Sequence, residues 1–265
     1  MTTATTAMAA TAATTGRGRT TAALTVLRSE LVKFTTLRSQ WIAPLVAVAL
    51  TAGITLAVNA AYGEVDHTPG EDQAGGIYYG LLFGHVAVAC IGILLIGQEF
   101  NTRMIGVSLT AVPQRGRLYG AKLTLGTALG LLVGLISTAG SFLAVAGTVG
   151  LDLSVPGMGR SFVAGVLYHP LLVVFCLGLT AMLRNFTAAL GLVTPMVFLG
   201  TTFLAAIPGV RELGQFLPDR AGLYAMRTQP DPTVHYGYWT GLLIMALWAA
   251  AAAYGGLRSI RRYTA

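Results

Sequence analysis

Six long apolar stretches alternate with short polar segments along the chain. Each stretch is continuously apolar and rich in Leu, Ala, Gly and Val, whereas the strands of a membrane β-barrel alternate apolar and polar positions over about 10 residues. A helix needs about 20 apolar residues to cross the hydrocarbon core of a bilayer. The pattern therefore predicts an all-α integral membrane protein with six transmembrane helices. The expected spans are 41–62, 77–97, 118–147, 162–183, 187–207 and 238–257.

The composition of the chain agrees with this interpretation. Hydrophobic residues make up 54% of the sequence and charged residues only 10%, with a mean hydropathy of +0.69. In a soluble domain about a quarter of the residues are charged. Six spans with short loops occupy most of the 265 residues, so a large soluble domain does not fit beside them.

The charged residues divide between the two sides of the membrane once the spans are drawn. Thirteen of the seventeen Lys and Arg residues fall on one side, whereas eight of the ten acidic residues fall on the other. Lys and Arg are retained in the cytoplasm during insertion, so both termini are expected to be cytoplasmic. The basic pI then reflects membrane topology, and no nucleic-acid partner is needed to explain it.

The N-terminal region changes character near residue 24. Residues 1–23 form a Thr- and Ala-rich tract without a pattern that would bury a face, which predicts a disordered cytoplasmic tail. Residues 24–40 carry apolar positions at helical spacing beside a basic flank, which predicts an amphipathic interfacial helix before the first span. A plain solvated helix is the alternative, but Trp41 favours membrane contact because Trp is enriched at membrane interfaces. The transmembrane domain is therefore expected to cover 24–265.

The third expected span contains a stripe of small residues. Gly126, Gly130 and Gly134 recur every four residues, a spacing that lets another helix approach closely. The partner helix could belong to the same subunit or to a second copy, and we favour packing within the subunit.

An extracellular segment at 208–236 separates the fifth and sixth expected spans. It contains four prolines among apolar residues and is too broken to cross the bilayer. Short helices at the outer surface would satisfy its backbone, whereas a loop exposed to lipid would not.

The loop after the second span, GQEFNTRMIGVSLTAVPQRGRLYGAK, contains more than a connector needs. Phe100, Met104 and Val107 predict a short amphipathic helix, which Pro113 would end. The basic residues that follow, Lys122 among them, are expected to anchor the next span at the lipid headgroups. A basic loop that only retains topology is the alternative.

Groups able to do chemistry are sparse within the spans. Cys90 and Cys176 are interpreted as packing groups, and no CxxC or HExxH metal spacing occurs. His85 and His169 are interpreted as hydrogen-bonded packing residues, with a proton relay as the alternative, because neither span contains an acidic partner. The sequence also lacks a GxxxxGK[ST] phosphate loop, so any ATP would be bound by another chain. We expect no metal or cofactor on this chain.

Three segments carry a resemblance to a known family. The first is RSELVKFTTLRSQW, at 28–41, and the third is GLTAMLRNFTAALGL, at 178–192, with a tight basic turn at Arg184. The second is the GQEF loop, which is similar to the pattern G-x-E-[YF]-x-[ST]-[GR]-M followed by L-x-A-x-P-x-R-x-R and a Lys. In their order and spacing these segments cover essentially the whole chain. The sequence resembles the permease subunits of ABC type-2 exporters, particularly those of actinobacteria.

The resemblance implies a multi-pass subunit of a bacterial plasma membrane, with the transmembrane fold of that family. It would pair with a second permease, in a homodimer or with a related chain, and with two cytoplasmic ATP-binding subunits that carry Mg-ATP. The loop at 98–117 would act as the coupling helix that seats in a cleft of the ATPase, and Arg103 stands where many relatives carry Gly. The expected transmission residues are Glu99, Phe100, Thr102, Arg103 and Met104, supported by Glu30, Lys33, Arg38 and Trp41 of the interfacial helix.

The cargo implied by the spans is hydrophobic or amphipathic, because few polar groups line them. The resemblance favours export of a drug or antibiotic, with a peptide or a lipid as further classes, and leaves open whether the lipid would be exported or flipped. An ion- or proton-coupled secondary transporter that works without an ATPase is the alternative function. The candidate pathway residues are Asn59, Tyr79, Phe83, His85, Phe142 and Phe198.

Overall fold

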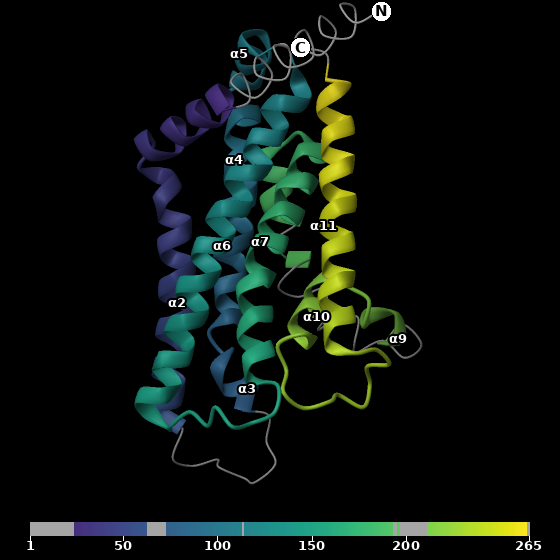
Figure 1. Cartoon of the computed structure of the whole chain (residues 1–265). Helices are drawn as coiled ribbons and strands as arrows, with labels where there is room; N and C mark the ends of the chain where they lie inside the picture. Colours follow the sequence, from purple (N-terminus) through teal and green to yellow (C-terminus); the bar gives the residue numbers. More distant parts are fainter. Residues whose placement is uncertain (1–23, 63–72, 113, 193–194, 197–210, 264–265) are drawn as a thin grey trace, which may run out of the picture.

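The computed structural model of the chain describes residues 24–62, 73–112, 114–192, 195–196 and 211–263. Most of these residues are helical, and no strand occurs among them. Five of the described helices are long and apolar enough to cross a membrane. They are α2 (Ser39–Tyr62), α4 (Leu81–Asn101), α6 (Arg115–Thr148), α7 (Met158–Leu183) and α11 (Tyr238–Arg261), as seen in Figure 1. The expected all-α architecture with multiple membrane-spanning helices is therefore confirmed.

Two expected segments fall partly or wholly outside the described part of the chain. Residues 187–192 and 195–196 of the fifth expected span are helical, and the remainder of that span is not described. The expected disordered tail at 1–23 is likewise outside the described residues. A sixth span therefore stays a prediction.

The second expected span is shifted along the chain. A short helix, α3 (Gln73–Ile77), precedes α4, which begins at Leu81 and continues through Asn101. The apolar run ends at Gly97, whereas the helix ends only where the backbone N–H of Thr102 donates to the carbonyl of Gln98. The last turn of α4 remains helical because its polar side chains find partners inside the protein, as described below.

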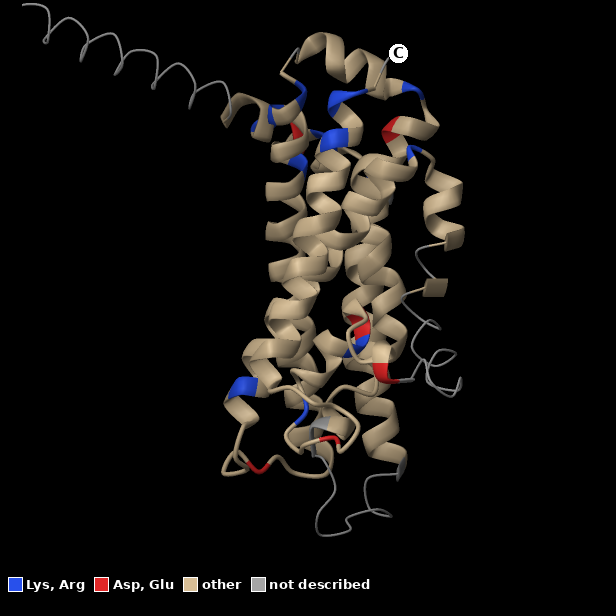
Figure 2. Cartoon of the chain, turned by 90° about the vertical axis from the view of Figure 1, so that its right-hand side faces the viewer, with Lys and Arg blue, Asp and Glu red and all other residues tan. Residues whose placement is uncertain are grey.

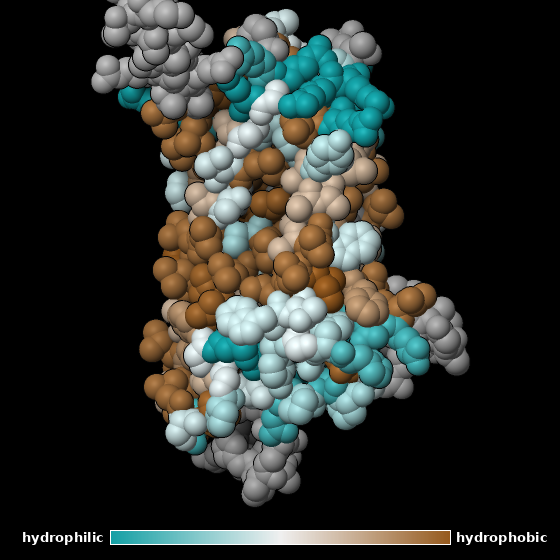
Figure 3. All heavy atoms as spheres, turned by 45° about the vertical axis from the view of Figure 1, so that its right-hand side comes forward, coloured by the Kyte–Doolittle hydropathy of each residue, from teal (hydrophilic) through white to brown (hydrophobic). Residues whose placement is uncertain are grey.

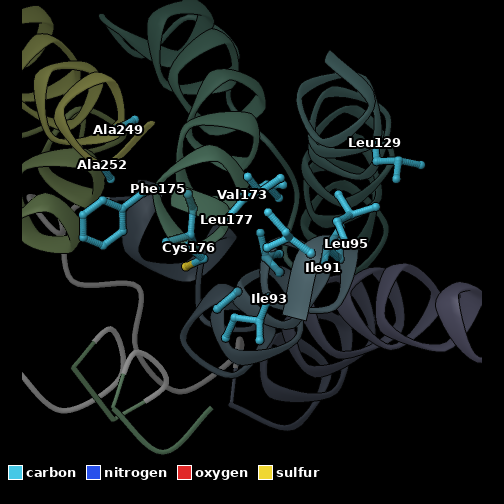
Figure 4. Packing of buried hydrophobic residues seen from close by; sticks show 14 of the residues in the cluster. Ile91, Ile93, Leu95, Leu129, Val173, Phe175, Cys176, Leu177, Ala249 and Ala252 are labelled. Carbon is cyan, nitrogen blue, oxygen red and sulfur yellow. The ribbon is translucent and has the colours of Figure 1, made fainter. Parts of the chain in front are cut away.

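Helix α7 lies inside the bundle. It packs against α4, α6 and α11, while α2 packs against α4 and α6 (Figure 1). The side chains that fill these contacts are apolar and buried in one continuous cluster (Figure 4). The labelled members are Ile91, Ile93 and Leu95 of α4, Leu129 of α6, Val173, Phe175, Cys176 and Leu177 of α7, and Ala249 and Ala252 of α11.

The glycine stripe of α6 faces α7 of the same chain. An ideal Cβ on Gly130 would lie 2.5 Å from the Cα of Pro170, and one on Gly134 would lie 2.6 Å from the carbonyl oxygen of Val166. Gly126 also faces α7, at ordinary van der Waals distances or slightly less. These positions bring the two backbones together because glycine has no side chain to separate them.

The two ends of the bundle differ in charge. One end carries residues 24–36, α5 (Met104–Ala111) and the C-terminal residues, and most of the described Lys and Arg residues lie there (Figure 2). We call it the basic end. Between the two ends, the face seen in Figure 3 is a band of mainly apolar side chains. This arrangement is the one expected of a bundle that crosses a bilayer with its ends in water.

The opposite end carries two short helices, α9 (Arg211–Gly214) and α10 (Pro218–Tyr224). They belong to the expected broken segment, 208–236, which the structure describes from residue 211 onward. Arg160 at the start of α7 donates hydrogen bonds to the backbone carbonyls of Ala225 and Arg227. Its guanidinium carbon also lies 3.6 Å from the centroid of the Tyr238 ring. The segment is thereby fastened to the ends of α7 and α11.

Candidate functional site

Four charged residues from three helices form a cluster at the basic end. Glu30 and Lys33 come from the interfacial helix, which spans 24–36 in the structure, Glu99 from the last turn of α4, and Lys122 from the third turn of α6. The Nζ atom of Lys122 lies 2.6 Å from Glu30 Oε2 and 2.9 Å from Glu99 Oε1. The Nζ atom of Lys33 lies 2.7 Å from Glu30 Oε1 and 3.0 Å from Glu99 Oε1. We call these four residues the ion cluster.

Lys122 is fully satisfied within the ion cluster. Its side chain is only 2% exposed, and its third hydrogen bond goes to the carbonyl oxygen of Leu95 at 3.1 Å. An ammonium group has three donors, and all three are used here. The expectation that Lys122 anchors α6 at the lipid headgroups is therefore wrong. Its charge is instead balanced inside the protein by Glu30 and Glu99, which is what a buried charge requires.

Lys33 occupies the outer side of the ion cluster, with 39% of its side chain exposed. Burial lowers the pKa of Lys33, but the hydrogen bond to Glu30 and the charge of Glu99 outweigh that effect and hold the pKa above its ordinary value. Lys33 is therefore charged at neutral pH. The cluster then contains two ammonium groups and two carboxylates, without net charge.

The chain turns sharply where α4 meets α5. Arg103 has a positive φ of 57°, a left-handed conformation that glycine adopts without strain. A glycine at this position would therefore adopt the same turn at a lower backbone cost than arginine. Thr102, next to it, donates its hydroxyl to the carbonyl of Gln98 at 2.8 Å. The turn projects α5 from the end of the bundle, directly beside the ion cluster.

The expected short helix is present as α5, but its apolar residues occupy both faces, so the expected amphipathic pattern is wrong. Ile105 and Leu109 are buried against the bundle, whereas Met104 and Val107 are 52% and 63% exposed. The exposed pair belongs to α5, which lies at the basic end of the bundle (Figure 1). The structure thus presents an apolar surface where the neighbouring side chains are polar.

The five expected transmission residues occupy two different environments. Thr102, Arg103 and Met104 are exposed on the turn and the first turn of α5. Glu99 lies in the ion cluster with 13% of its side chain exposed, and its Oε2 atom has no hydrogen-bond partner in the part of the chain that is described. Phe100 packs on the ring of Tyr263, with ring centroids 6.0 Å apart. The first three are therefore the most accessible to another protein, whereas Glu99 and Phe100 are partly buried.

The C-terminal residues hold the basic end together, which the sequence did not indicate. Arg115 donates to the backbone carbonyls of Arg261, at 3.0 Å, and Tyr263, at 2.5 Å. Arg184 donates to both the hydroxyl and the carbonyl of Ser259. Basic side chains can satisfy the free carbonyls at the C-terminal end of a helix. Arg115 and Arg184 lie close to helix ends in the sequence, which is the signal that could have suggested these contacts.

The other expected residues of the interfacial helix are more exposed. The ring of Trp41 is 4.9 Å from that of Phe34, which is buried, and Trp41 itself is 41% exposed. Arg38 is exposed at the turn before α2. These two residues do not join the ion cluster.

The described candidate pathway residues differ in their surroundings. Asn59 donates to the carbonyls of Thr55 and Gly76 and thereby joins α2 to α3. Tyr79 and Phe83 are each 50% exposed, whereas His85 and Phe142 are buried. Phe198 lies outside the described residues.

No group of three or more His, Cys, Asp or Glu residues able to hold a metal ion occurs in the described residues. The two cysteines are free, with Cys176 buried and Cys90 partly buried. A comparison with protein-family models finds none that matches the chain, and a search of curated proteins finds no match.

Proposed function

We propose that this chain is the membrane-spanning permease subunit of an ATP-driven exporter of the ABC type-2 class. The observation that carries the proposal is α5, a short helix with exposed Met104 and Val107 at the basic end of the bundle. Apolar side chains that gather on a polar surface favour a protein partner that covers them. A cytoplasmic ATP-binding subunit would supply that cover.

The positive-inside rule supports this placement of the partner. The basic end is the cytoplasmic end if Lys and Arg set the topology, so both described chain ends and α5 face the cytoplasm. The chain has no phosphate loop of its own. ATP would therefore be hydrolysed by a separate subunit, present in two copies.

The ion cluster supports a role for α5 in transmitting movement. It joins the interfacial helix, α4 and α6 by four ion pairs of 2.6–3.0 Å. A displacement of α5 by an ATP-driven partner would act on these helices as one body and change the balance between inward-open and outward-open states. Thr102, Arg103 and Met104 would contact the partner, whereas Glu99 would act through the cluster.

The cargo in this proposal is a hydrophobic or amphipathic molecule, such as a drug, an antibiotic, a peptide or a lipid. Two of the candidate pathway side chains, Tyr79 and Phe83, are half exposed, so the cargo would move along an interface between two permeases. A homodimer is the simplest such assembly, and a related second permease would serve equally. Exposed aromatic residues such as Tyr79 and Phe83 would then face that interface.

The experiment that tests the proposal is an affinity purification of the tagged chain from its native membrane, with identification of co-purified proteins and an ATPase assay. We expect an ATP-binding subunit in about equal amount to the chain and hydrolysis that vanadate inhibits. A chain that purifies alone and without nucleotide turnover would contradict the proposal. It would favour the secondary transporter, for which the buried His85 and His169 are the candidate proton carriers within the spans.

Paired variants make the test specific to α5. A chain with Met104→Asp and Val107→Asp should lose the ATP-binding subunit, because two charges would replace the apolar contact. Leu153→Asp is the matched control, since Leu153 is also highly exposed, at 71%, but lies in the loop at the opposite end. Equal recovery of the ATP-binding subunit with both variants would show that α5 is not the docking surface.

A further inference from the structure

A second set of polar side chains is buried in the half of the bundle away from the basic end. These side chains come from α4, α6 and α7, and each is at most 2% exposed. We call them the polar layer. Its members are His85, Ser137, Thr138, Ser141, Tyr168 and His169.

Contacts between the helices bring the polar layer together. The rings of His85 and Tyr168 are 5.3 Å apart between centroids. His169 lies against α6, where an ideal Cβ on Gly134 would be 3.0 Å from the His169 Cβ. One turn nearer the end of the bundle opposite the basic end, an ideal Cβ on Gly165 of α7 would be 3.0 Å from Cγ2 of Thr138 in α6. The layer is thus continuous from α4 through α7 to α6.

Helix α10 covers the polar layer on the side of Tyr168. Gly222 of α10 lies so close to the Tyr168 ring that a Cβ there would overlap it. The polar layer therefore has no direct opening past α10 at this point.

Each member of the polar layer has a side-chain atom without a hydrogen-bond partner in the described structure. These atoms are His85 Nε2, Ser137 Oγ, Thr138 Oγ1, Ser141 Oγ, Tyr168 Oη and His169 Nε2. Most buried polar groups in proteins are hydrogen-bonded, because a buried group without a partner loses its hydrogen bonds to water and gains none in return. Six such atoms in the same half of the bundle favour a partner such as ordered water.

The hydroxyl groups alone do not require an external partner. A Ser or Thr on a helix can bond a carbonyl one turn earlier, as Thr124 and Thr127 of α6 do. Tyr168 Oη and the Nε2 atoms of His85 and His169 stand at the outer ends of their rings, too far from their own backbone to bond it in this way. The three rings therefore carry the inference.

The hydrogen bond of His169 defines the chemistry that the partner needs. Its Nδ1 atom lies 2.7 Å from the carbonyl oxygen of Gly165, which only accepts, so Nδ1 carries the proton. In the neutral ring Nε2 is then an acceptor and needs a donor. Tyr168 Oη can both donate and accept. A molecule that does both, and is small enough to enter a packed bundle, satisfies all three rings.

We propose that the polar layer binds ordered water, held by His85, Tyr168 and His169. A buried water makes about three hydrogen bonds, which is the number of ring groups that lack a partner here. The proposal is independent of the proposed transport function, since it concerns the inside of one chain. It adds a hydrated site between α4, α6 and α7.

The first test is hydroxyl-radical footprinting by X-ray radiolysis of the full chain in lipid nanodiscs, read by mass spectrometry. Radicals form from water, so a buried ring beside bound water is oxidised although bulk solvent does not reach it. We expect Tyr168 to be oxidised several-fold faster than Phe175. Phe175 is the matched control, because it is a buried aromatic residue two turns away on the same helix, and its ring packs on Trp248. Equal, slow oxidation of the two rings would overturn the proposal.

The second test uses Tyr168→Phe, which keeps the ring and removes only the hydroxyl. If the hydroxyl is bonded to water, its loss destabilises the fold, whereas loss of an unpaired buried hydroxyl would stabilise it. We expect the thermal midpoint to fall by about 2–4 °C. Tyr254→Phe is the control, since Tyr254 is 63% exposed and should leave the midpoint unchanged. A rise in the midpoint of Tyr168→Phe would overturn the proposal.

Discussion

Lys122 of α6 and Glu30 of the interfacial helix form a buried ion pair of 2.6 Å between residues 92 positions apart. Lys122→Met should destabilise the protein by about 3–5 kcal/mol, because Glu30 and Glu99 would then share only Lys33 as a positive partner. The free energy of unfolding in detergent, from denaturant titration, measures this cost.

A double variant separates the ion pair from other contacts of Lys122. Glu30→Gln combined with Lys122→Met should cost clearly less than the sum of the two single changes, because the second change removes a charge that the first left unpaired. If the two costs simply add, the pair is not coupled and our account of the ion cluster fails.

Lys33→Met should have a much smaller effect, of about 0–1 kcal/mol, because Lys33 is the exposed member of the ion cluster. The pKa of Lys33 is raised in the folded protein, so its stabilising effect is fully present below its ordinary pKa of 10.5 and is lost as the pH rises through the folded value. The difference in thermal midpoint between wild type and Lys33→Met should therefore be constant from pH 7 to 9 and narrow only above 10.5. Narrowing already near pH 8 would contradict the raised pKa.

Gly130→Ala should destabilise the bundle by about 1–3 kcal/mol, because the added methyl group would meet the backbone of Pro170 at 2.5 Å. Gly120→Ala is the matched control on the same helix, with no atom within 4 Å of the added carbon. That change should be neutral or stabilise by up to about 1 kcal/mol, since Ala favours helix more than Gly does. Thermal unfolding of both variants measures the difference, and similar midpoints would show that α6 and α7 separate easily.

Arg160→Met should loosen the segment that contains α9 and α10. Arg160 holds two backbone carbonyls of this segment and lies over the Tyr238 ring, and a methionine offers no hydrogen bond to replace these contacts. Faster amide hydrogen exchange in 211–237 is the expected result. Arg227→Met is the control, because Arg227 is 53% exposed and pairs only with Asp231 in the described structure; equal exchange in the two variants would contradict a special role for Arg160.

The orientation of the bundle is testable with single cysteines in a chain where Cys90 and Cys176 are replaced by Ala. Arg103→Cys should react with a membrane-impermeant maleimide only after the cells are opened. Leu153→Cys should react in intact cells. The reverse pattern would place the basic end outside and would remove α5 as a contact for a cytoplasmic partner.

The membrane helices were predictable because each depends on a long local apolar run. The run at 118–147, for example, corresponds to α6, and the glycine stripe inside it lies on a packing face. The helix of the GQEF loop was also predictable, but its buried face was not, since Met104 and Val107 are exposed whereas Ile105 and Leu109 are buried. The ends of the helices were harder to predict. Helix α4, for example, extends past the apolar run into residues whose partners lie elsewhere in the chain.

The ion cluster was not predictable from local pattern, because it joins residues far apart in sequence. The sequence nevertheless contained a signal: Glu30 and Glu99 are the only acidic residues among the segments assigned to the basic side. An acidic residue placed against the topological trend favours pairing with one of the many cations there. The distinction between exposed Lys33 and buried Lys122 required the packing of α4 against α6.

The separation of Glu30 and Lys122 along the chain constrains how the protein is made. The ribosome adds Lys122 92 residues after Glu30, which takes on the order of 5–20 s. During that interval Glu30 has no α6 to pair with, and Lys33 of the same helix is the partner within its reach. The ion cluster can close only after α6 has been made, so the interfacial helix reaches its final position after the third membrane helix.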